Sequence, residues 1–463
     1  MYLSDEEEDF NFLSLSKFES MLKTNKILFF DSEEFEEIIL HYLDTGKANL
    51  AKKALNLALD QHPNSTGLKL VQVEMFIYNE KLDAAEKLLN ELHAIEPQNE
   101  EIYIQRATIF SKKNDHDKAI ECLRTALNFT DDKADVYNLL GMEFLFTDNL
   151  EEAKESFIKC LEEDDYDQSS LYNVVYCFEF LDQTEEAIAY LDQYIDKNPY
   201  SEIAWHQSGR LYYSLEMYTQ ALRAFEYATL IDDGFLGAFM EKGKSLERLK
   251  RYEEAIVAFN KTIELNDPTS YAFLRIGKCY EALGDKELAL EYYNQTVHED
   301  PLLDKGWIAI TDLFLNDKDY EKALHYLNEA LSIDNENGEY WKRYATLHKE
   351  LNFLVEAELG YRKAVEFCDV EIDNWLYWVD NLQFTGELEL AVKTLLEATE
   401  FFPEAYEIEY RLAGLYYTLG KDKKGKFHLS NALRLDSSQH TIIEKSFPEA
   451  WKRKVVQNIQ WLS

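Results

Sequence analysis

Residues 270–301 read SYAFLRIGKCYEALGDKELALEYYNQTVHEDP. A small side chain, Ala289, is followed four residues later by Tyr293 and seven residues later by Thr296. Residues at this spacing share one face of an α-helix, and the alternation of small and large side chains suits close packing against a second helix. Pro301 stands where the later helix must stop. The stretch therefore predicts an antiparallel pair of helices joined by a short turn.

The same pattern recurs along the chain at a fixed step of 34 residues. A large apolar residue follows each small one four positions later, from Leu55 to Leu429. Glycines such as Gly141 and Gly243 stand twelve positions before the small residue. An internal repeat of this length is typical of stacked helical units, each of which buries its apolar face against its neighbours. The series is Ala51, Ala85, Ala119, Ala153, Ala187, Ala221, Ala255, Ala289, Ala323, Ala357 and Ala391, with Gly425 in the next position.

This spacing resembles the tetratricopeptide repeat. The resemblance implies an all-α, right-handed superhelical solenoid of about twelve antiparallel helix pairs. We expect the repeats to span 32–439, between an acidic N-terminal segment with a capping helix at 1–31 and capping helices at 440–463. Within 270–301, the positions that carry the resemblance are Phe273, Ile276, Gly277, Tyr280, Ala289, Tyr293, Thr296 and Pro301.

The composition limits the partners that the protein can have. The 48 Lys and Arg residues against 88 Asp and Glu residues give a net charge of −40, which disfavours binding to nucleic acid or to anionic membranes. No apolar run is long enough to span a membrane, and the first residues are acidic where a secretory signal would be basic. The five cysteines form no CxxC pair, as in a protein of a reducing compartment. We expect a soluble, cytoplasmic protein.

Motifs of enzymes are absent or incomplete. Gly420, Gly425 and Lys426 match most of a phosphate-binding loop, but Phe427 stands where the magnesium-binding hydroxyl is required, and no strand is expected before it. The sequence has no HExxH, GxSxG or GxGxxG motif. We therefore predict no catalytic residue, no cofactor and no metal site.

The resemblance also implies where a partner would bind. In this family the first helix of each pair lines an inner groove that holds peptides or partner helices. The groove-facing positions lie eighteen, fifteen, eleven, eight and seven residues before each small residue of the 34-residue series. Three successive repeats carry a cation eleven positions before: Arg210, Lys244 and Lys278. The candidate groove comprises Tyr172, Tyr176, His206, Arg210, Tyr213, Lys244, Arg248, Arg275 and Lys278.

These residues support a specific hypothesis and leave an alternative. The cations and rings would bind an acidic, partly aromatic peptide segment through charge-assisted hydrogen bonds and ring contacts. Alternatively, Lys244 and Lys278 form ordinary surface pairs with Glu247 and Glu281, which follow them by three residues. The predicted function is a non-enzymatic scaffold or adaptor, or else a regulatory or accessory subunit of an enzyme or assembly complex. The sequence does not indicate an oligomeric state.

Overall fold

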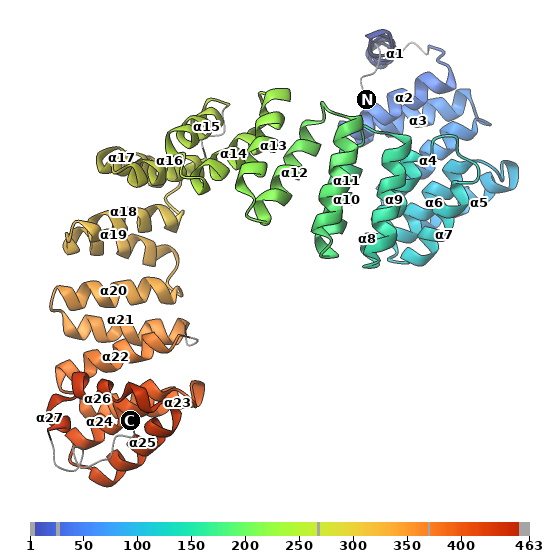
Figure 1. The fold of residues 1–463 in the computed structure, drawn as a ribbon. Helices are drawn as coiled ribbons and strands as arrows, with labels where there is room; N and C mark the ends of the chain where they lie inside the picture. Colours follow the sequence, from blue (N-terminus) through green and yellow to red (C-terminus); the bar gives the residue numbers. More distant parts are fainter. Residues whose placement is uncertain (1–4, 25–27, 266–268, 369–370, 453–463) are drawn as a thin grey trace. The chain divides into compact units, whose positions relative to one another are not determined.

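The computed structural model describes residues 5–24, 28–265, 269–368 and 371–452. They form two compact units, Met1–Ile231 and Asp232–Ser463. In each unit, helices follow one another as antiparallel pairs in the order of the chain (Figure 1). The described residues are helical or irregular and contain no strand. The all-α solenoid of twelve helix pairs is therefore confirmed.

The first unit contains one leading helix and six helix pairs, and the second contains six pairs followed by two short helices. The helices of the first unit are α1 (Asp5–Thr24), α2 (Ser32–Asp44), α3 (Ala48–Gln61), α4 (Thr66–Tyr78), α5 (Leu82–Ile95), α6 (Glu100–Lys112), α7 (His116–Ala126), α8 (Ala134–Phe146), α9 (Leu150–Glu163), α10 (Gln168–Phe180), α11 (Thr184–Lys197), α12 (Glu202–Ser214) and α13 (Tyr218–Ile231). Those of the second are α14 (Leu236–Arg248), α15 (Tyr252–Glu264), α16 (Ser270–Leu283), α17 (Lys286–Glu299), α18 (Asp304–Asn316), α19 (Tyr320–Ile333), α20 (Gly338–Glu350), α21 (Leu354–Phe367), α22 (Ile372–Thr385), α23 (Leu388–Phe401), α24 (Tyr406–Thr418), α25 (Asp422–Leu435), the 3-10 turn η1 (Ser437–Gln439), α26 (Thr441–Ser446) and α27 (Pro448–Trp451).

The small residues of the repeat allow the two helices of a pair to approach closely. Every alanine of the 34-residue series is completely buried. At Gly243 of α14, an added Cβ would lie 2.4 Å from the ring of Phe259 on α15. At Gly141 of α8, it would lie 2.5 Å from the ring of Phe157 on α9. A ring from the second helix thus fills the space left by a glycine on the first, so neither residue can change size without displacing the other.

The turn inside each pair places one residue in the left-handed backbone region. Glycine adopts this conformation without cost, whereas other residues lose roughly 1 kcal/mol or more. Within the described residues, four of the twelve turns use glycine there, and the other eight use a residue with a side chain. The twelve residues with positive φ are Gly46, Glu80, Asn114, Asp148, Asp182, Glu216, Lys250, Gly284, Lys318, Asn352, Gly386 and Gly420.

Both ends of the array carry apolar side chains that pack onto the adjoining repeats. In α1, Phe18 is completely buried, and its ring centroid lies 5.9 Å from that of Phe30. At the other end, Pro448 separates α26 from α27 by starting the second helix. Residues 453–463 lie outside the described residues, and the domain boundaries at 31 and 440 stay a prediction.

Candidate protein-interaction surface

The nine candidate groove residues are divided between the two units. Tyr172 and Tyr176 lie on α10, and His206, Arg210 and Tyr213 on α12, all within the first unit. The remaining residues, Lys244 and Arg248 on α14 and Arg275 and Lys278 on α16, belong to the second unit. The row of three cations is therefore divided, with Arg210 in the first unit and Lys244 and Lys278 in the second.

The first unit exposes a row of aromatic rings along α10. Tyr172 is 41% exposed, Tyr176 is 43% exposed and Phe180 is 63% exposed. A spacing of four residues places them on one helix face, and the ring centroids of Tyr176 and Phe180 lie 4.4 Å apart. Phe180 was missed in the sequence, although it occupies one of the groove-facing positions, seven residues before Ala187. We call Tyr172, Tyr176 and Phe180 the ring row.

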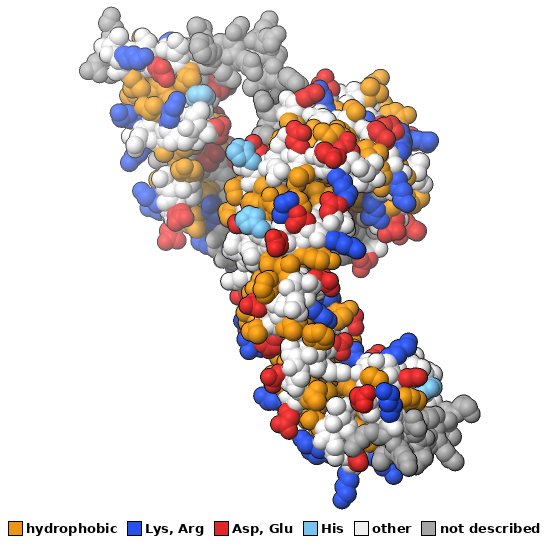
Figure 2. Space-filling model, turned by 90° about the vertical axis from the view of Figure 1, so that its left-hand side faces the viewer, with side chains coloured by type: hydrophobic (Ala, Val, Ile, Leu, Met, Phe, Trp, Pro, Cys, Tyr) orange, Lys and Arg blue, Asp and Glu red, His pale blue; other side chains and the backbone are white. Residues whose placement is uncertain are grey.

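Phe146 occupies the same repeat position as Phe180, one repeat earlier. It is 61% exposed and stacks on the imidazole of His116, with ring centroids 5.2 Å apart. His116 in turn lies 2.8 Å from a carboxylate oxygen of Glu143 on α8. Exposed hydrophobic side chains also reach the surface elsewhere, between acidic and basic ones, as the face in Figure 2 shows. A single exposed ring is ordinary, but three on one helix face form a contiguous apolar strip of the kind found at interaction sites.

Arg210 occupies the position of Tyr176 in the next repeat, eleven residues before the small residue of the series. Its side chain is paired with two residues of the same protein. Its Nη1 donates a hydrogen bond to Gln207 Oε1 at 2.6 Å, and its Nη2 lies 3.5 Å from Glu179 Oε1 on α10. The ion pair is long, and the Arg210 side chain is 42% exposed. Arg210 is therefore available for exchange with another carboxylate at small cost.

In the second unit, the basic residues are paired more tightly. Lys244 Nζ lies 2.7 Å from Glu241 Oε1 on its own helix. Arg275 Nη1 lies 3.1 Å from Glu247 Oε2 on α14, and its Nε and Nη2 donate hydrogen bonds to the hydroxyl oxygen of Tyr271 at 3.0 and 2.6 Å. These contacts join the first helices of two successive repeats.

The predicted pairs of Lys244 with Glu247 and of Lys278 with Glu281 are not formed among the described residues. Lys244 pairs with the glutamate three residues before it, because Glu247 is taken by Arg275 of the next repeat. Glu281 instead accepts a hydrogen bond from the Tyr293 hydroxyl at 2.7 Å. Burial raises the pKa of Glu247, while the nearby positive charges of Arg275, Lys278 and Lys244 oppose this rise. The lysines thus act on Glu247 through space and not through a direct pair.

Sequence models of one family match the repeats between residues 76 and 337. Models described as tetratricopeptide repeat match residues 76–142, 134–167, 169–201, 206–270, 271–302 and 305–337. The chain belongs to the tetratricopeptide repeat family. Its repeats imply a role in protein–protein interaction, and proteins built from this repeat are typically non-catalytic.

Comparison with individual proteins adds examples but no closer assignment. No curated protein matches the chain. Among solved structures, the chain is similar to the crystal structure of the APC/C hetero-tetramer Cut9-Hcn1, with 14% identity and a TM-score of 0.38 over 88% of this chain and 93% of that one. It is similar to a tetratricopeptide repeat protein from Parabacteroides merdae, with 20% identity and a TM-score of 0.37 over 51% of this chain and 93% of that one. It is also similar to MamA, with 19% identity and a TM-score of 0.32 over 35% of this chain and 95% of that one.

Ion pairs between neighbouring tetratricopeptide repeats recur on the first helices. Each joins an arginine to a carboxylate of the repeat before it. Such pairs connect adjacent first helices. They contribute little to stability where the pair is long and exposed, as in Arg210–Glu179, and more where the carboxylate is largely buried, as in Arg275–Glu247. The four pairs are Arg210–Glu179 in the first unit and Arg275–Glu247, Arg343–Asp312 and Arg411–Asp380 in the second.

The last tetratricopeptide repeat has its groove-facing positions covered by the chain itself. Gly414 lies eleven residues before Gly425, and an added Cβ there would meet the ring of Phe447 at 2.2 Å, so no side chain fits. Phe447 is 3% exposed. Gln383 of the preceding repeat donates a hydrogen bond from Nε2 to the carbonyl oxygen of Ser446 at 2.7 Å. The segment between α26 and α27 thus lies where the resemblance places a bound peptide.

Two observations limit other kinds of site. Within the described ranges, no three His, Cys, Asp or Glu side chains gather as ligands of a metal ion. No helix within those ranges combines the length and the apolar character that crossing a membrane requires.

Proposed function

We propose that the protein is a non-enzymatic scaffold or adaptor that binds a peptide segment of a partner on the first helices of its repeats. The ring row on α10 is the observation that carries this proposal. Tyr172, Tyr176 and Phe180 expose apolar area that no neighbouring repeat covers. Burial of exposed rings contributes about 25 cal/mol per Å² of apolar area, and aromatic residues dominate the binding energy of many interfaces.

The chain supplies an internal example of such binding. Phe447 places its ring against Gly414, and Gln383 holds the adjacent backbone carbonyl of Ser446. A ring in a pocket combined with a hydrogen bond to a main-chain oxygen is a general way of holding a peptide. A partner segment on α10 would bury its own apolar residues against the ring row in the same manner.

Charge favours an acidic segment. Arg210 holds Glu179 at 3.5 Å and is more exposed than Arg275, so a carboxylate of the partner can replace Glu179 with little loss. The proposed partner is therefore acidic and partly aromatic. The ion pairs Lys244–Glu241 and Arg275–Glu247 have shorter N–O distances than Arg210–Glu179, so we expect them to stay intact when the partner binds.

We also propose the location and the domain limits. The five cysteines are free thiols, which supports a reducing compartment such as the cytoplasm. The packing of Phe18 and Phe447 supports capping segments at 1–31 and 440–463 around repeats at 32–439.

Affinity capture with quantitative mass spectrometry tests the proposed function. The variant Tyr176→Ala/Phe180→Ala is compared with Tyr377→Ala/Phe384→Ala, which removes two exposed rings of α22 in the second unit. We expect the first variant to lose a partner by at least tenfold and the second to retain it. Equal capture by both variants would contradict binding on α10, whereas one stoichiometric enzyme partner would identify an accessory subunit.

A charge variant tests the partner's chemistry separately. Arg210→Glu is compared with Arg251→Glu, which changes an exposed cation that is paired within α15 and its preceding turn. An acidic partner segment requires weaker capture by Arg210→Glu, with a larger difference at low salt. Unchanged capture at every salt concentration would rule out an acidic segment at this position.

A further inference from the structure

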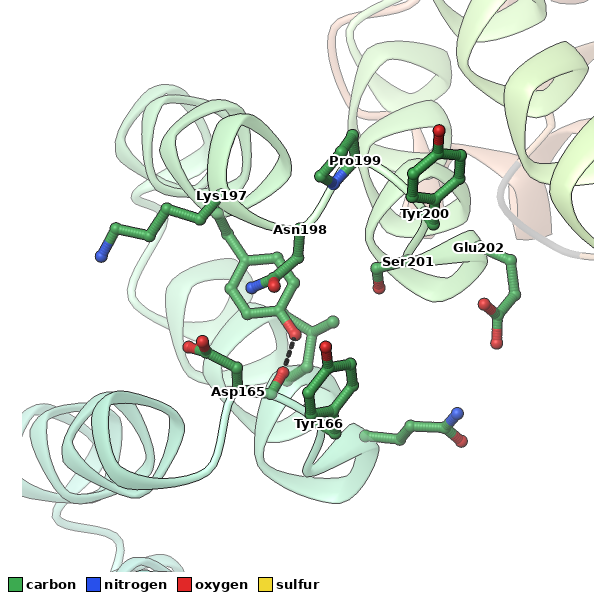
Figure 3. A pocket seen from close by; sticks show the side chains of 11 residues that line it. Asp165, Tyr166, Lys197, Asn198, Pro199, Tyr200, Ser201 and Glu202 are labelled. Atoms are coloured by element: carbon green, nitrogen blue, oxygen red, sulfur yellow. Dashed lines mark hydrogen bonds between the residues drawn. The ribbon is translucent and has the colours of Figure 1, made fainter. Parts of the chain in front are cut away.

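A second candidate binding site lies in the first unit, away from the ring row. A pocket of about 290 Å³ opens between two loops, the one that joins α9 to α10 and the one that joins α11 to α12 (Figure 3). Both loops connect one tetratricopeptide repeat to the next. The pocket therefore lies at the edge where the repeats are joined. Gln168 and Leu171 of the first turn of α10 also line it, whereas the three residues of the ring row do not.

The loops are held in place by hydrogen bonds that leave the pocket preformed. The Tyr194 hydroxyl donates to the carbonyl oxygen of Asp165 at 2.5 Å, the bond drawn as a dashed line in Figure 3. The backbone N–H of Tyr166 donates to Asp164 Oδ1 at 3.0 Å. In the second loop, Trp205 Nε1 donates to the carbonyl oxygen of Pro199 at 3.0 Å. A ligand would thus meet ordered loops and would not have to order them.

Two tyrosines border the pocket and remain in solvent. Tyr166 is 84% exposed and Tyr200 is 82% exposed. They occupy the same position of consecutive repeats, thirteen residues after Ala153 and Ala187, and no other repeat has an aromatic residue there. Neither ring is needed for packing at such exposure, so a pair of free ring faces is specific to this edge.

The charge around the pocket is negative. Asp165 and Glu202 line it, against Lys197 as the one cation in its lining. Glu162 and Glu163 precede the loop that joins α9 to α10. Burial raises the pKa of Tyr194 to about 12, and the charge of Asp165 adds to the rise. A cation is the ligand that such a field attracts.

The pocket also has a spare hydrogen-bond donor. Asn198 lines it, and its buried Nδ2 has no hydrogen-bond partner among the residues that the structure describes. A buried amide N–H without a partner is costly and is satisfied by an acceptor such as a peptide carbonyl oxygen. Rings, carboxylates and an amide donor together match the side chain and the backbone of a basic residue.

We propose that this pocket binds an arginine side chain of a basic segment from a second protein. The planar guanidinium stacks on the faces of Tyr166 and Tyr200, its charge is balanced by Asp165 and Glu202, and the segment's backbone carbonyl accepts from Asn198. Arginine fits better than lysine because it can lie flat on a ring while donating hydrogen bonds at its edge. The site is independent of the ring row, which is proposed to bind an acidic segment.

Fluorine NMR of the full chain labelled with 3-fluorotyrosine tests the proposal. The probe is an acetylated and amidated pentapeptide with one central arginine between glycine and serine residues, and its control carries citrulline, which has the same shape without the charge. Tyr166→Phe and Tyr200→Phe assign the two resonances, and Tyr78→Phe assigns an exposed reference ring on α4.

The arginine peptide should shift both loop resonances in a saturable way and leave Tyr78 unchanged, and the citrulline peptide should bind at least tenfold more weakly. Asp165→Asn/Glu202→Gln should weaken binding by at least fivefold more than Glu163→Gln/Asp196→Asn, which removes two nearby acids outside the pocket lining. Equal shifts from the two peptides, no saturation, or equal loss in the two double variants would each overturn the proposal.

Discussion

The helices α10 and α16 occupy equivalent places in their repeats and differ in what they leave open. On α10, Tyr176 and Phe180 are exposed, and their rings contact each other. On α16, Arg275 contacts both Glu247 of the previous repeat and Tyr271 of its own helix. A charged side chain finds a counter-charge in a chain that is rich in acids, whereas the exposed rings of α10 keep part of their apolar area in solvent. The groove-facing side chains of α10 thus retain binding area, whereas Arg275 on α16 joins two repeats.

Of the changes considered, Phe447→Ala should have the largest effect on the free energy of unfolding. The change removes a buried ring from the surface of α24, and we expect a loss of about 3 kcal/mol from the free energy of unfolding of the C-terminal repeat. Because repeats unfold locally, hydrogen exchange in α24 and α26 is the appropriate measurement. The control is Phe427→Ala on α25, whose ring is 62% exposed. If both variants exchange like the wild type, the covering of Gly414 contributes no stability.

Arg275→Met should destabilise the second unit by about 2 kcal/mol at pH 8, because it leaves the largely buried Glu247 without its partner. The pKa of Glu247 is already raised by burial and would rise further. A carboxyl group with a raised pKa in the folded state costs stability as the pH rises from its unfolded to its folded pKa.

The deficit of Arg275→Met should therefore be smaller at pH 5.5 than at pH 8. Both values lie above the sequence pI of about 4.6, so the chain stays negatively charged. Urea midpoints of the variant and the wild type at the two pH values give the comparison. A deficit that is equal at both would show that Glu247 does not ionise in this range in the variant.

Lys250→Gly tests a feature that the two units share. Lys250 has φ of 60° in the turn between α14 and α15, where Gly284 serves the next repeat with φ of 84°. Removing the side chain should raise stability by about 1 kcal/mol, measured as a higher urea midpoint. Gly284→Ala should lower it by a similar amount. A destabilised Lys250→Gly would mean that the lysine side chain contributes more than its backbone costs.

Arg210→Met should have the smallest effect, a loss of less than about 0.5 kcal/mol, because its pair with Glu179 is long and exposed. Measured beside Arg275→Met under the same conditions, it compares the pairing of one arginine in each unit. An equal loss in both variants would show that Arg210 is as structural as Arg275 and would remove the reason to propose it as the exchangeable cation.

Much of the fold could be predicted from single positions. The alanines at the 34-residue step and the glycines opposite Phe157 and Phe259 are buried contacts within one repeat, so their spacing in the sequence is sufficient to reveal them. The turns were partly predictable, since Gly46 and Gly284 mark a position that recurs in every repeat. The sequence identified two of the three residues of the ring row, Tyr172 and Tyr176. Only the exposed fraction of its side chain distinguishes Phe180 from the many other aromatic residues of the chain.

Other features depended on contacts between repeats. The sequence placed a glutamate three residues after Lys244 but could not show that Arg275 competes for it. It gave no sign that Phe447 lies on Gly414, or that Tyr166 and Tyr200 border one pocket. These contacts join residues on different helices, and their choice depends on side-chain directions that a linear pattern does not specify.

The sequence by itself determined that this chain is a row of tetratricopeptide repeats, because a period of 34 residues with small and large side chains in step leaves one way to bury the apolar faces. The tertiary structure decided which groove-facing side chains are paired, covered or open. That outcome depends on which side chains lie within contact distance of a charge or a ring. Neighbouring repeats carry different side chains at the same position, so the contacts differ from repeat to repeat.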